Sequence, residues 1–269
     1  MLKNQLVSEI FNKRSYLCVG LDTDFDKIPA HLKSQPNAIL DFNKAIIDAT
    51  KDYCVSYKIN TAFFEVLGSK GWDIMQETFD YIPSTHLKIA DAKRGDIGNT
   101  SHQYAKAFFE GMKVDAITVA PYMGEDSIRP FLEYEGKWTI VLGLTSNQGS
   151  NDFQQLKLAD GSALYGKVLK TIAAWGSPEN LMFVTGATRS DAFSAIRELV
   201  PGNFLLVPGV GAQGGSLQEV SKHGFNKECG LLVNASRAVI YASGGEDFAE
   251  AAARVSKTYC EEMALYLPK

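Results

Sequence analysis

The stretch HLKIADAKRGDIGNT (86–100) joins a short apolar run, HLKIA, to a charged loop. Runs of the same kind, rich in β-branched and aromatic residues, recur along the chain and are typical of buried strands. The other runs are YLCVGL (16–21), CVSYKI (54–59), AITVA (116–120), WTIVLGL (138–144), LMFVT (181–185), FLLVP (204–208) and GLLVN (230–234). Segments with helical spacing lie between them, including NAILDFNKAIIDATK (37–51), SALYGKVLKTIAAW (162–175) and SDAFSAIRELV (190–200), and a last helix is expected from about Glu246 to Leu267.

Strands that alternate with helices indicate βαβ units and a parallel sheet. Because eight such units can be counted, we predict an α/β fold of the closed (β/α)8 TIM-barrel type. An open, doubly wound sheet is the alternative architecture. The chain has 269 residues, 45% of them hydrophobic, and contains no linker-like segment, so we expect one domain spanning residues 1–269.

Composition argues against several classes of partner. The net charge of −4 provides no chain-wide basic field, so nucleic-acid binding is not expected. No apolar run reaches the ~18 residues that a membrane-spanning helix needs, and the segment 1–15 lacks the apolar core of a signal peptide. The four cysteines are far apart and form no CxxC pair, which is typical of reduced, buried thiols. We therefore expect a soluble, cytoplasmic protein.

Polar residues gather where the apolar runs end. In a parallel barrel the carboxyl ends of all strands share one face, and active sites are built on that face. The polar positions therefore predict a functional site at one mouth of the barrel. The residues at or just beyond these ends are Asp22, Lys58, Asn60, Asp91, Lys93, Thr145, Ser146, Pro208 and Asn234.

The charged cluster in DAKRGD (91–96) is the most informative part of that face. Asp91 and Lys93 are two residues apart at a strand end, so their side chains leave the strand on the same side, and Asp96 follows in the loop. In a pocket of low dielectric constant, alternating carboxylates and an ammonium stabilise one another's charged forms. Such an array would keep Lys93 protonated and ready to donate a proton. A solvated loop with ordinary surface charges is the alternative interpretation.

Two further charges favour the functional interpretation. Lys58 lies inside the apolar run CVSYKI, where a lysine without partners would be costly, and Asp22 follows YLCVGL. Each could belong to a separate structural ion pair. Because several acids and bases converge on one predicted face, a functional site is the better explanation.

The glycine-rich segment FLLVPGVGAQGG (204–215) contains a GxGxxG pattern at Gly209, Gly211 and Gly214. A dinucleotide-binding site would require this pattern after the first strand, with an acidic residue ending the next strand. Here it follows the seventh run, and the next run ends in Asn234. The loops after strands seven and eight of a barrel often bind phosphate, and Arg237 lies just past the eighth run, where a guanidinium can hold phosphate oxygens. A glycine turn and an unrelated surface arginine are the alternative.

No metal motif is evident from the histidines. His31, His86, His102 and His223 are scattered and form no HxH or HExxH pair, so zinc or iron is not expected. The sequence does not decide whether Asp or Glu side chains bind magnesium.

The segment DAKRGDIGNT (91–100) resembles the DxKxxD signature of orotidine 5′-phosphate decarboxylases. Further blocks resemble the same family in order, and the set is closest to its longer bacterial branch with DAKRGDIG. One difference is the long, polar loop TSNQGSNDFQQLKLADG (145–161). The resembling blocks are VGLDTDFDKIP, YKINTAFFE, TVAPYMGEDS, VLGLTSNQGSNDFQ, VPGVGAQGG and VNASRAV.

The resemblance implies an enzyme that converts orotidine 5′-monophosphate (OMP) to UMP and carbon dioxide in pyrimidine biosynthesis, with no metal and no organic cofactor. It implies that Lys93 protonates C6 of the pyrimidine, that Asp91 lies beside the departing carboxylate, and that Lys58 holds the charge network. It also implies a homodimer with shared active sites, in which Asp96 and Thr100 reach the ribose in the partner's site.

The remaining implied contacts are to substrate. Asp22 and Lys58 would contact the ribose, Ser146 the pyrimidine, and Gln213 and Arg237 the phosphate, with backbone N–H groups near Gly214. Asn60 and Pro208 are counted with the substrate-binding residues because each ends a strand at the same mouth.

Three rival functions stay open at this point. One is a magnesium-dependent phosphosugar enzyme on the same barrel, such as a ketogulonate-phosphate decarboxylase or a hexulose-phosphate synthase. Another is a Schiff-base aldolase that uses Lys58 or Lys93 as its nucleophile. The third is a non-catalytic protein that binds a phosphorylated ligand without turnover.

Overall fold

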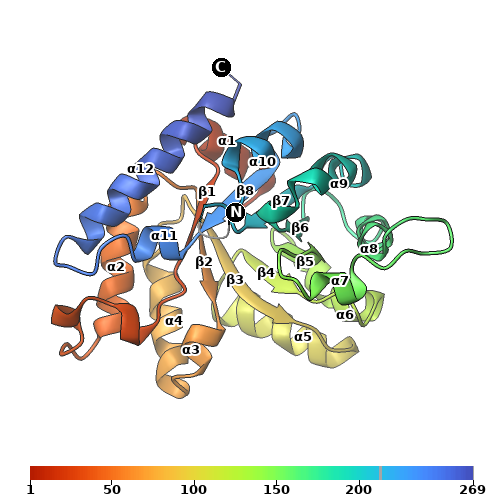
Figure 1. Ribbon diagram of the computed structural model, residues 1–269. Coiled ribbons are helices and arrows are strands. Elements are labelled where there is room, and N and C mark those ends of the chain that lie inside the picture. The colour runs from red at the N-terminus through yellow and green to blue at the C-terminus, as the bar shows by residue number, and fades with distance from the viewer. Residues whose placement is uncertain (212–213, 269) are drawn as a thin grey trace.

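Eight parallel strands form a closed barrel in sequence order in the computed structural model, which describes residues 1–211 and 214–268 (Figure 1). β1 pairs with both β2 and β8, which closes the barrel. The predicted (β/α)8 architecture is therefore confirmed, and the open-sheet alternative is wrong. The strands are β1 (Leu17–Gly20), β2 (Ser56–Asn60), β3 (Leu87–Arg94), β4 (Ala116–Val119), β5 (Trp138–Leu144), β6 (Leu181–Thr185), β7 (Phe204–Pro208) and β8 (Leu231–Ala235).

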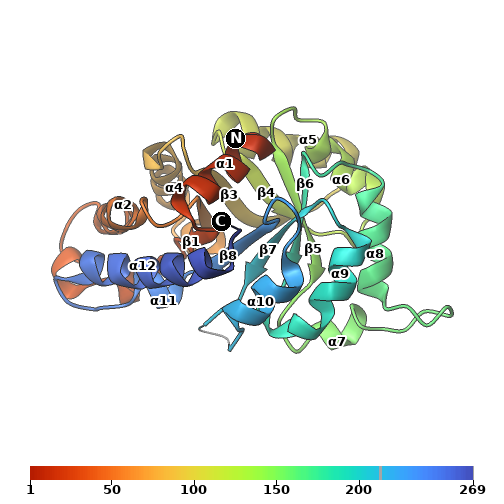
Figure 2. The same cartoon turned by 90° about the horizontal axis from the view of Figure 1, so that it is seen from above.

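Helices surround the strands, as the view from above shows (Figure 2). The longer helices are α1 (Lys3–Lys13), α2 (Ala38–Thr50), α4 (Ser69–Tyr81), α5 (Gly98–Lys106), α6 (Glu125–Leu132), α8 (Leu164–Ala173), α9 (Phe193–Leu199), α10 (Leu217–Gly224) and α12 (Phe248–Tyr266). Short helical turns lie in the connections, namely η1 (Phe25–Lys27), η2 (Ala30–Leu32), α3 (Ala62–Glu65), η3 (Ala107–Gly111), α7 (Ser150–Phe153), η4 (Ala187–Ala192) and α11 (Arg237–Ile240).

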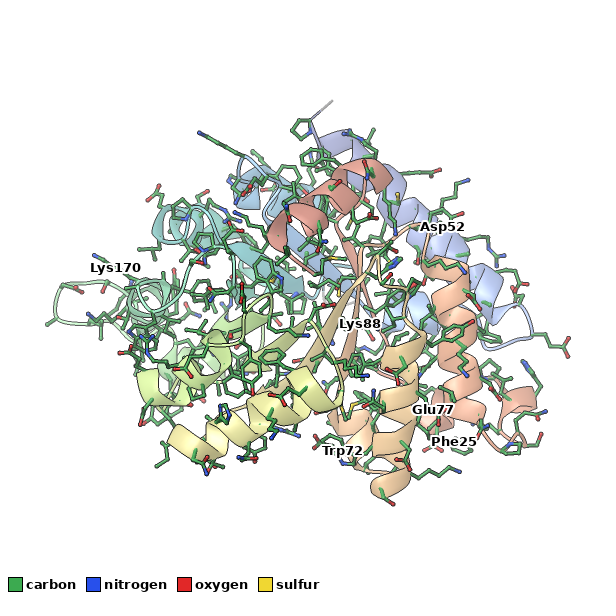
Figure 3. All side chains as sticks on the ribbon, turned by 180° about the vertical axis from the view of Figure 1, so that it is seen from behind. Phe25, Asp52, Trp72, Glu77, Lys88 and Lys170 are labelled. Carbon is green, nitrogen blue, oxygen red and sulfur yellow. The ribbon has the colours of Figure 1, made fainter. Side chains whose placement is uncertain are left out.

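The strands are buried on both faces. Every residue of β1, β4, β6 and β8 is buried, because inward side chains fill the barrel and outward ones contact the helices. This explains why the strands appear in the sequence as continuous apolar runs rather than alternating ones. Charged side chains such as Asp52, Glu77 and Lys170 instead project from the outer surface (Figure 3).

The cysteines agree with the sequence interpretation. Cys18, Cys54 and Cys229 are buried, Cys260 is partly buried, and all are free thiols. Among the described residues, the helices are too short or too polar for any to cross a lipid bilayer.

Candidate active site

Four charged side chains form a continuous network at the carboxyl ends of β1, β2 and β3. The Lys58 Nζ lies 3.2 Å from Asp22 Oδ1 and 3.2 Å from Asp91 Oδ2. The Lys93 Nζ lies 2.6 Å from Asp91 Oδ1. Acid and base therefore alternate in the order Asp22, Lys58, Asp91, Lys93. Of the predicted array of Asp91, Lys93 and Asp96, only Asp91 and Lys93 are joined in one chain, and Lys58 and Asp22 extend the network.

Burial and pairing together set the charge states in this network. Lys58 is only 4% exposed. Burial lowers its pKa, but attraction to Asp22 and Asp91 outweighs burial and the net shift is upward. Burial likewise opposes ionisation of Asp91, yet Lys58 and Lys93 outweigh it and lower the Asp91 pKa to about 2. Both groups are therefore charged at neutral pH.

A cavity of about 190 Å³ opens beside this network and extends to the ends of β7 and β8. Its walls bring together segments that are far apart in the sequence because β1 and β8 are neighbours in the barrel. Its lining residues are Asp22, Lys58, Asp91, Pro208, Gly209, Val210, Asn234, Ala235, Ser236, Arg237 and Ala238. Three members of the network, Asp22, Lys58 and Asp91, thus line the same pocket as Arg237 at the predicted phosphate end, and Lys93 adjoins it through Asp91.

The described residues of the loop after β7 form turn hydrogen bonds, and this loop follows the seventh strand rather than the first, unlike a dinucleotide-binding motif. Gly209, Gly211 and Gly214 all have positive φ, between 73° and 99°, which glycine tolerates and other residues rarely adopt. The Gly214 N–H donates to the Gly211 carbonyl at 2.9 Å, and the Gly215 N–H donates to the Gly209 carbonyl at 3.2 Å. Gln213, predicted to contact phosphate, lies outside the described residues.

Arg237 begins α11 and is exposed at the cavity wall. Within the described part of the chain it forms no ion pair, so its guanidinium is available to an anionic ligand. Next to it, the Ser236 hydroxyl is buried and has no hydrogen-bond partner among the same residues. Both groups lie where the sequence predicted the phosphate.

Asp96 and Thr100 are not part of the network in their own chain. The Asp96 carboxylate accepts a hydrogen bond from the Ile97 N–H at 2.7 Å and forms no ion pair with any described residue. Thr100 is exposed on α5. Asp96 is partly exposed and Thr100 exposed, so both are accessible from outside this subunit.

Asn60 ends β2 beside the network. Its backbone N–H donates to Asp22 Oδ1 at 3.2 Å, and its side-chain oxygen accepts from the Ala62 N–H at 3.2 Å. Asn60 thus orients Asp22 through its backbone. Among the described residues, no group of three or more His, Cys, Asp or Glu side chains is arranged to hold a metal ion.

Comparisons with known proteins decide the family. Residues 15–254 match the model of the orotidine 5′-phosphate decarboxylase / HUMPS family. The chain belongs to this family. Its relatives include an orotidine 5′-phosphate decarboxylase of Bacteroides fragilis, 56% identical over 98% of this chain and 97% of the relative. Another, from Flavobacterium johnsoniae, is 57% identical over the same shares.

Solved structures agree with the sequence relatives. The OMP decarboxylase of Leishmania donovani is 35% identical, with a TM-score of 0.85 over 99% of both chains. The UMP synthase of the same organism is 37% identical, and this chain spans 56% of its length. This chain is therefore an orotidine 5′-phosphate decarboxylase. The magnesium-dependent, Schiff-base and non-catalytic alternatives are set aside.

The decarboxylase also contains a braced loop that sequence reasoning did not resolve. Ser146 follows β5, and its backbone lies so near Gly186 that a Cβ there would be 2.6 Å from the Ser146 nitrogen. The Thr145 N–H donates to the Gln154 side chain at 2.8 Å, and Arg189 donates to the Ser150 hydroxyl at 2.8 Å. These contacts fix the segment carrying Ser146 against the turn after β6.

Two supporting residues of the decarboxylase were missed in the sequence. The Tyr241 hydroxyl donates to the Asp22 carbonyl at 3.2 Å and accepts from the Asp24 N–H at 2.7 Å, which fixes the loop carrying Asp22. Thr118 contacts both Asp91 and Lys93. Threonine is common in strands, so within the apolar run AITVA (116–120) only the polarity of Thr118 could have indicated a role in the site.

Proposed function

We propose that the enzyme decarboxylates OMP to UMP with Lys93 as the proton donor and without a metal or organic cofactor. The observation that carries the proposal is the network from Asp22 to Lys93 at the edge of a cavity that reaches Arg237. When the bond between C6 and the carboxylate breaks, its electron pair stays on C6 and carbon dioxide leaves. The Lys93 ammonium stabilises this developing carbanion and then transfers its proton to C6.

Asp91 and Lys58 prepare the site for that step. Because Asp91 stays ionised beside the position proposed for the substrate carboxylate, it holds the Lys93 amine and disfavours a second anion nearby. Lys58 is anchored by two carboxylates, so its position is fixed before substrate arrives. With Asp22, it is placed to contact the ribose.

Phosphate is held at the other end of the cavity in this proposal. Arg237 supplies the charge, and Gln213 and backbone N–H groups near Gly214 add hydrogen bonds. Pro208 and Asn60 shape the walls between the two ends, and Ser146 meets the pyrimidine ring. Binding energy from phosphate, which does not react, can then be used to hold the reacting ring in place.

The active sites are shared in a homodimer according to this proposal. Large apolar side chains are exposed on the loops after β2, β3 and β4, with Val66 79%, Ile97 55%, Tyr122 94% and Met123 49% exposed. Exposed large apolar side chains on neighbouring loops are common where a protein binds another protein. A second copy is the partner we propose, because Asp96 precedes the exposed Ile97 and would reach the partner's site with Thr100.

We also assign the enzyme to the cytoplasm. Buried, unpaired cysteines such as Cys18, Cys54 and Cys229 fit a reducing compartment.

The test is turnover of OMP by chelator-treated protein, followed as loss of the ultraviolet absorbance of OMP. We expect full activity after chelation, and we expect Lys93→Ala to lower turnover by more than about 1,000-fold while still binding UMP. Lys170→Ala, an exposed lysine on α8, is the matched control and should match wild type. Turnover that needs added magnesium, or near-normal turnover by Lys93→Ala, would contradict the proposal.

A further inference from the structure

The strand that carries Lys93 is irregular at the site. β3 and β4 pair regularly at Ala90 and Ile117, and the next pair is Arg94 with Val119. Three residues of β3, from Asp91 to Lys93, therefore lie opposite the single residue Thr118 of β4. A bulge of this kind interrupts the ladder of backbone hydrogen bonds and re-aims side chains.

Lys93 adopts a backbone conformation that lysine rarely takes. Its φ is +48°, in the left-handed region that favours glycine. Such a conformation persists only when the surroundings hold it. The Lys93 N–H donates to the Thr118 Oγ1 at 2.9 Å, which replaces the ladder hydrogen bond lost at the bulge.

The same hydroxyl also contacts the carboxylate partner of Lys93. Thr118 Oγ1 donates to Asp91 Oδ1 at 2.9 Å, and the Lys93 Nζ lies 2.6 Å from that oxygen. Thr118 is fully buried, so water does not compete for its hydroxyl. The Thr118 hydroxyl therefore accepts a hydrogen bond from the Lys93 backbone with its oxygen and donates its proton to the Asp91 carboxylate.

We propose that Thr118 is a positioning residue for decarboxylation, fixing Lys93 and Asp91 relative to each other through one hydroxyl. The inference rests on the proposed role of Lys93 as proton donor. Without the hydroxyl, Asp91 can rotate and Lys93 can relax toward ordinary strand geometry. Because proton transfer and carbanion stabilisation depend steeply on geometry, the chemical step suffers more than ligand binding.

The experiment compares Thr118→Val, which keeps the shape but removes the hydroxyl, with Thr118→Ser, which keeps the hydroxyl. Thr139→Val is the matched control. Thr139 is a buried threonine on the adjacent strand β5, and its hydroxyl has no hydrogen-bond partner among the described residues. For each variant, kcat and KM for OMP are measured with the affinity for UMP.

We expect Thr118→Val to lower kcat by about 10- to 100-fold, with KM and UMP affinity within about threefold of wild type. Thr118→Ser should retain most of the wild-type kcat, and Thr139→Val should have the wild-type kcat. If Thr118→Val does not fold, Thr118→Ala is judged by the same criteria. If neither folds, the hydroxyl is needed for the fold and the proposal is wrong.

Two other results would overturn the proposal. One is wild-type kcat in Thr118→Val, and the other is a loss of UMP affinity as large as the loss of kcat. Lys93→Ala, assayed alongside, separates this failure from failure of the proposed function. If Lys93→Ala is inactive and Thr118→Val is fully active, only the positioning role of Thr118 is wrong. If Lys93→Ala is active, the proton-donor role of Lys93 is wrong.

Discussion

Arg237 is the exposed guanidinium at the cavity wall, and within the described residues no carboxylate competes for it. We predict that Arg237→Ala weakens UMP binding by at least about tenfold, since a charge-assisted hydrogen bond contributes about 1.5–3 kcal/mol. Uridine, which lacks the phosphate, should bind the variant and the wild type equally. Calorimetric titration of both ligands measures the difference, with Arg254→Ala on the outer surface of α12 as the control. Unchanged UMP affinity would remove Arg237 from the phosphate site.

His86 is a buried histidine at the amino end of β3, far along its strand from the network. Its Nε2 lies 2.8 Å from the Lys51 carbonyl and 2.9 Å from the Lys13 Nζ. Burial, reinforced by the charge of Lys13, lowers the His86 pKa from 6.5 to about 4. The folded protein therefore keeps this imidazole neutral over a pH range in which the unfolded chain protonates it.

The sign of the pH effect follows from that difference. Between pH 6.5 and about 4 the unfolded state binds more protons, so the free energy of unfolding falls as the pH falls through this window. The His86 contribution amounts to about 3 kcal/mol at most. Urea unfolding at pH 7, 5.5 and 4.5 should show a steeper loss of stability in wild type than in His86→Gln. Parallel losses in the two proteins would show that His86 titrates normally.

Site residues at the mouth of the barrel could be predicted from the sequence where a charged side chain stands at the end of an apolar strand. Asp22, Lys58, Asp91 and Lys93 stand out because charges at the ends of apolar runs need partners. Thr118 does not stand out, since threonine suits a strand and its role depends on a bulge in the neighbouring strand. A bulge has no sequence signature here, because the left-handed position holds lysine rather than glycine.

Arg197 connects α9 with the end of α10 and with the segments that precede β7 and β8. From α9, its guanidinium donates to the carbonyls of Gly224 at the end of α10 and Gly230 before β8, and to those of Val200 and Asn203 before β7. Burial lowers its pKa to about 10, so it stays charged at neutral pH. Its partners are backbone carbonyls, of which those of Gly230 and Val200 also accept hydrogen bonds from the N–H groups of Leu205 and Asn203.

We predict that Arg197→Met lowers the free energy of unfolding by about 2–4 kcal/mol, because it removes the hydrogen bonds from a buried guanidinium to four backbone carbonyls. Chemical denaturation followed by circular dichroism measures the change. Arg254→Met, at an exposed arginine on α12, should have no measurable effect. Equal denaturation midpoints for Arg197→Met and wild type would mean that water replaces the guanidinium at little cost.

Element boundaries were predicted best where burial alone defines them. β6 coincides with its apolar run, and the last helix, expected at 246–267, is observed at 248–266. β3 extends to Arg94, past the apolar run ending at Ala90, because Asp91 pairs with Asn60 of β2 and Arg94 pairs with Val119 of β4 beyond the bulge. The helix expected from residue 190 begins as α9 at Phe193, after the 3-10 turn η4.

For the whole molecule, barrel closure is what turns separate motifs into one site. Asp22 and Arg237 are at opposite ends of the chain, yet both line one cavity because β1 and β8 are hydrogen-bonded neighbours. In an open doubly wound sheet, the first strand lies inside the sheet and the last strand lies at an edge, so the two would not be neighbours. The sequence could predict this convergence only by counting strands. The sequence could not show whether a mouth residue acts in its own subunit or in a partner. This question matters most for Asp96.

Subunit mixing tests whether Asp96 acts in its own chain or in a partner. We predict that Lys93→Ala and Asp96→Asn, each nearly inactive alone, regain activity when they are unfolded together and refolded. In a hybrid dimer, one site combines Lys93 of one chain with Asp96 of the other, so random pairing should restore roughly a quarter of wild-type turnover. The control pairs Lys93→Ala with Lys58→Ala. Because Lys58 and Lys93 belong to one network in one chain, no hybrid site is intact and no activity should return. If the first pair stays as inactive as the control while hybrid dimers form, Asp96 does not cross the interface and the shared-site dimer is wrong.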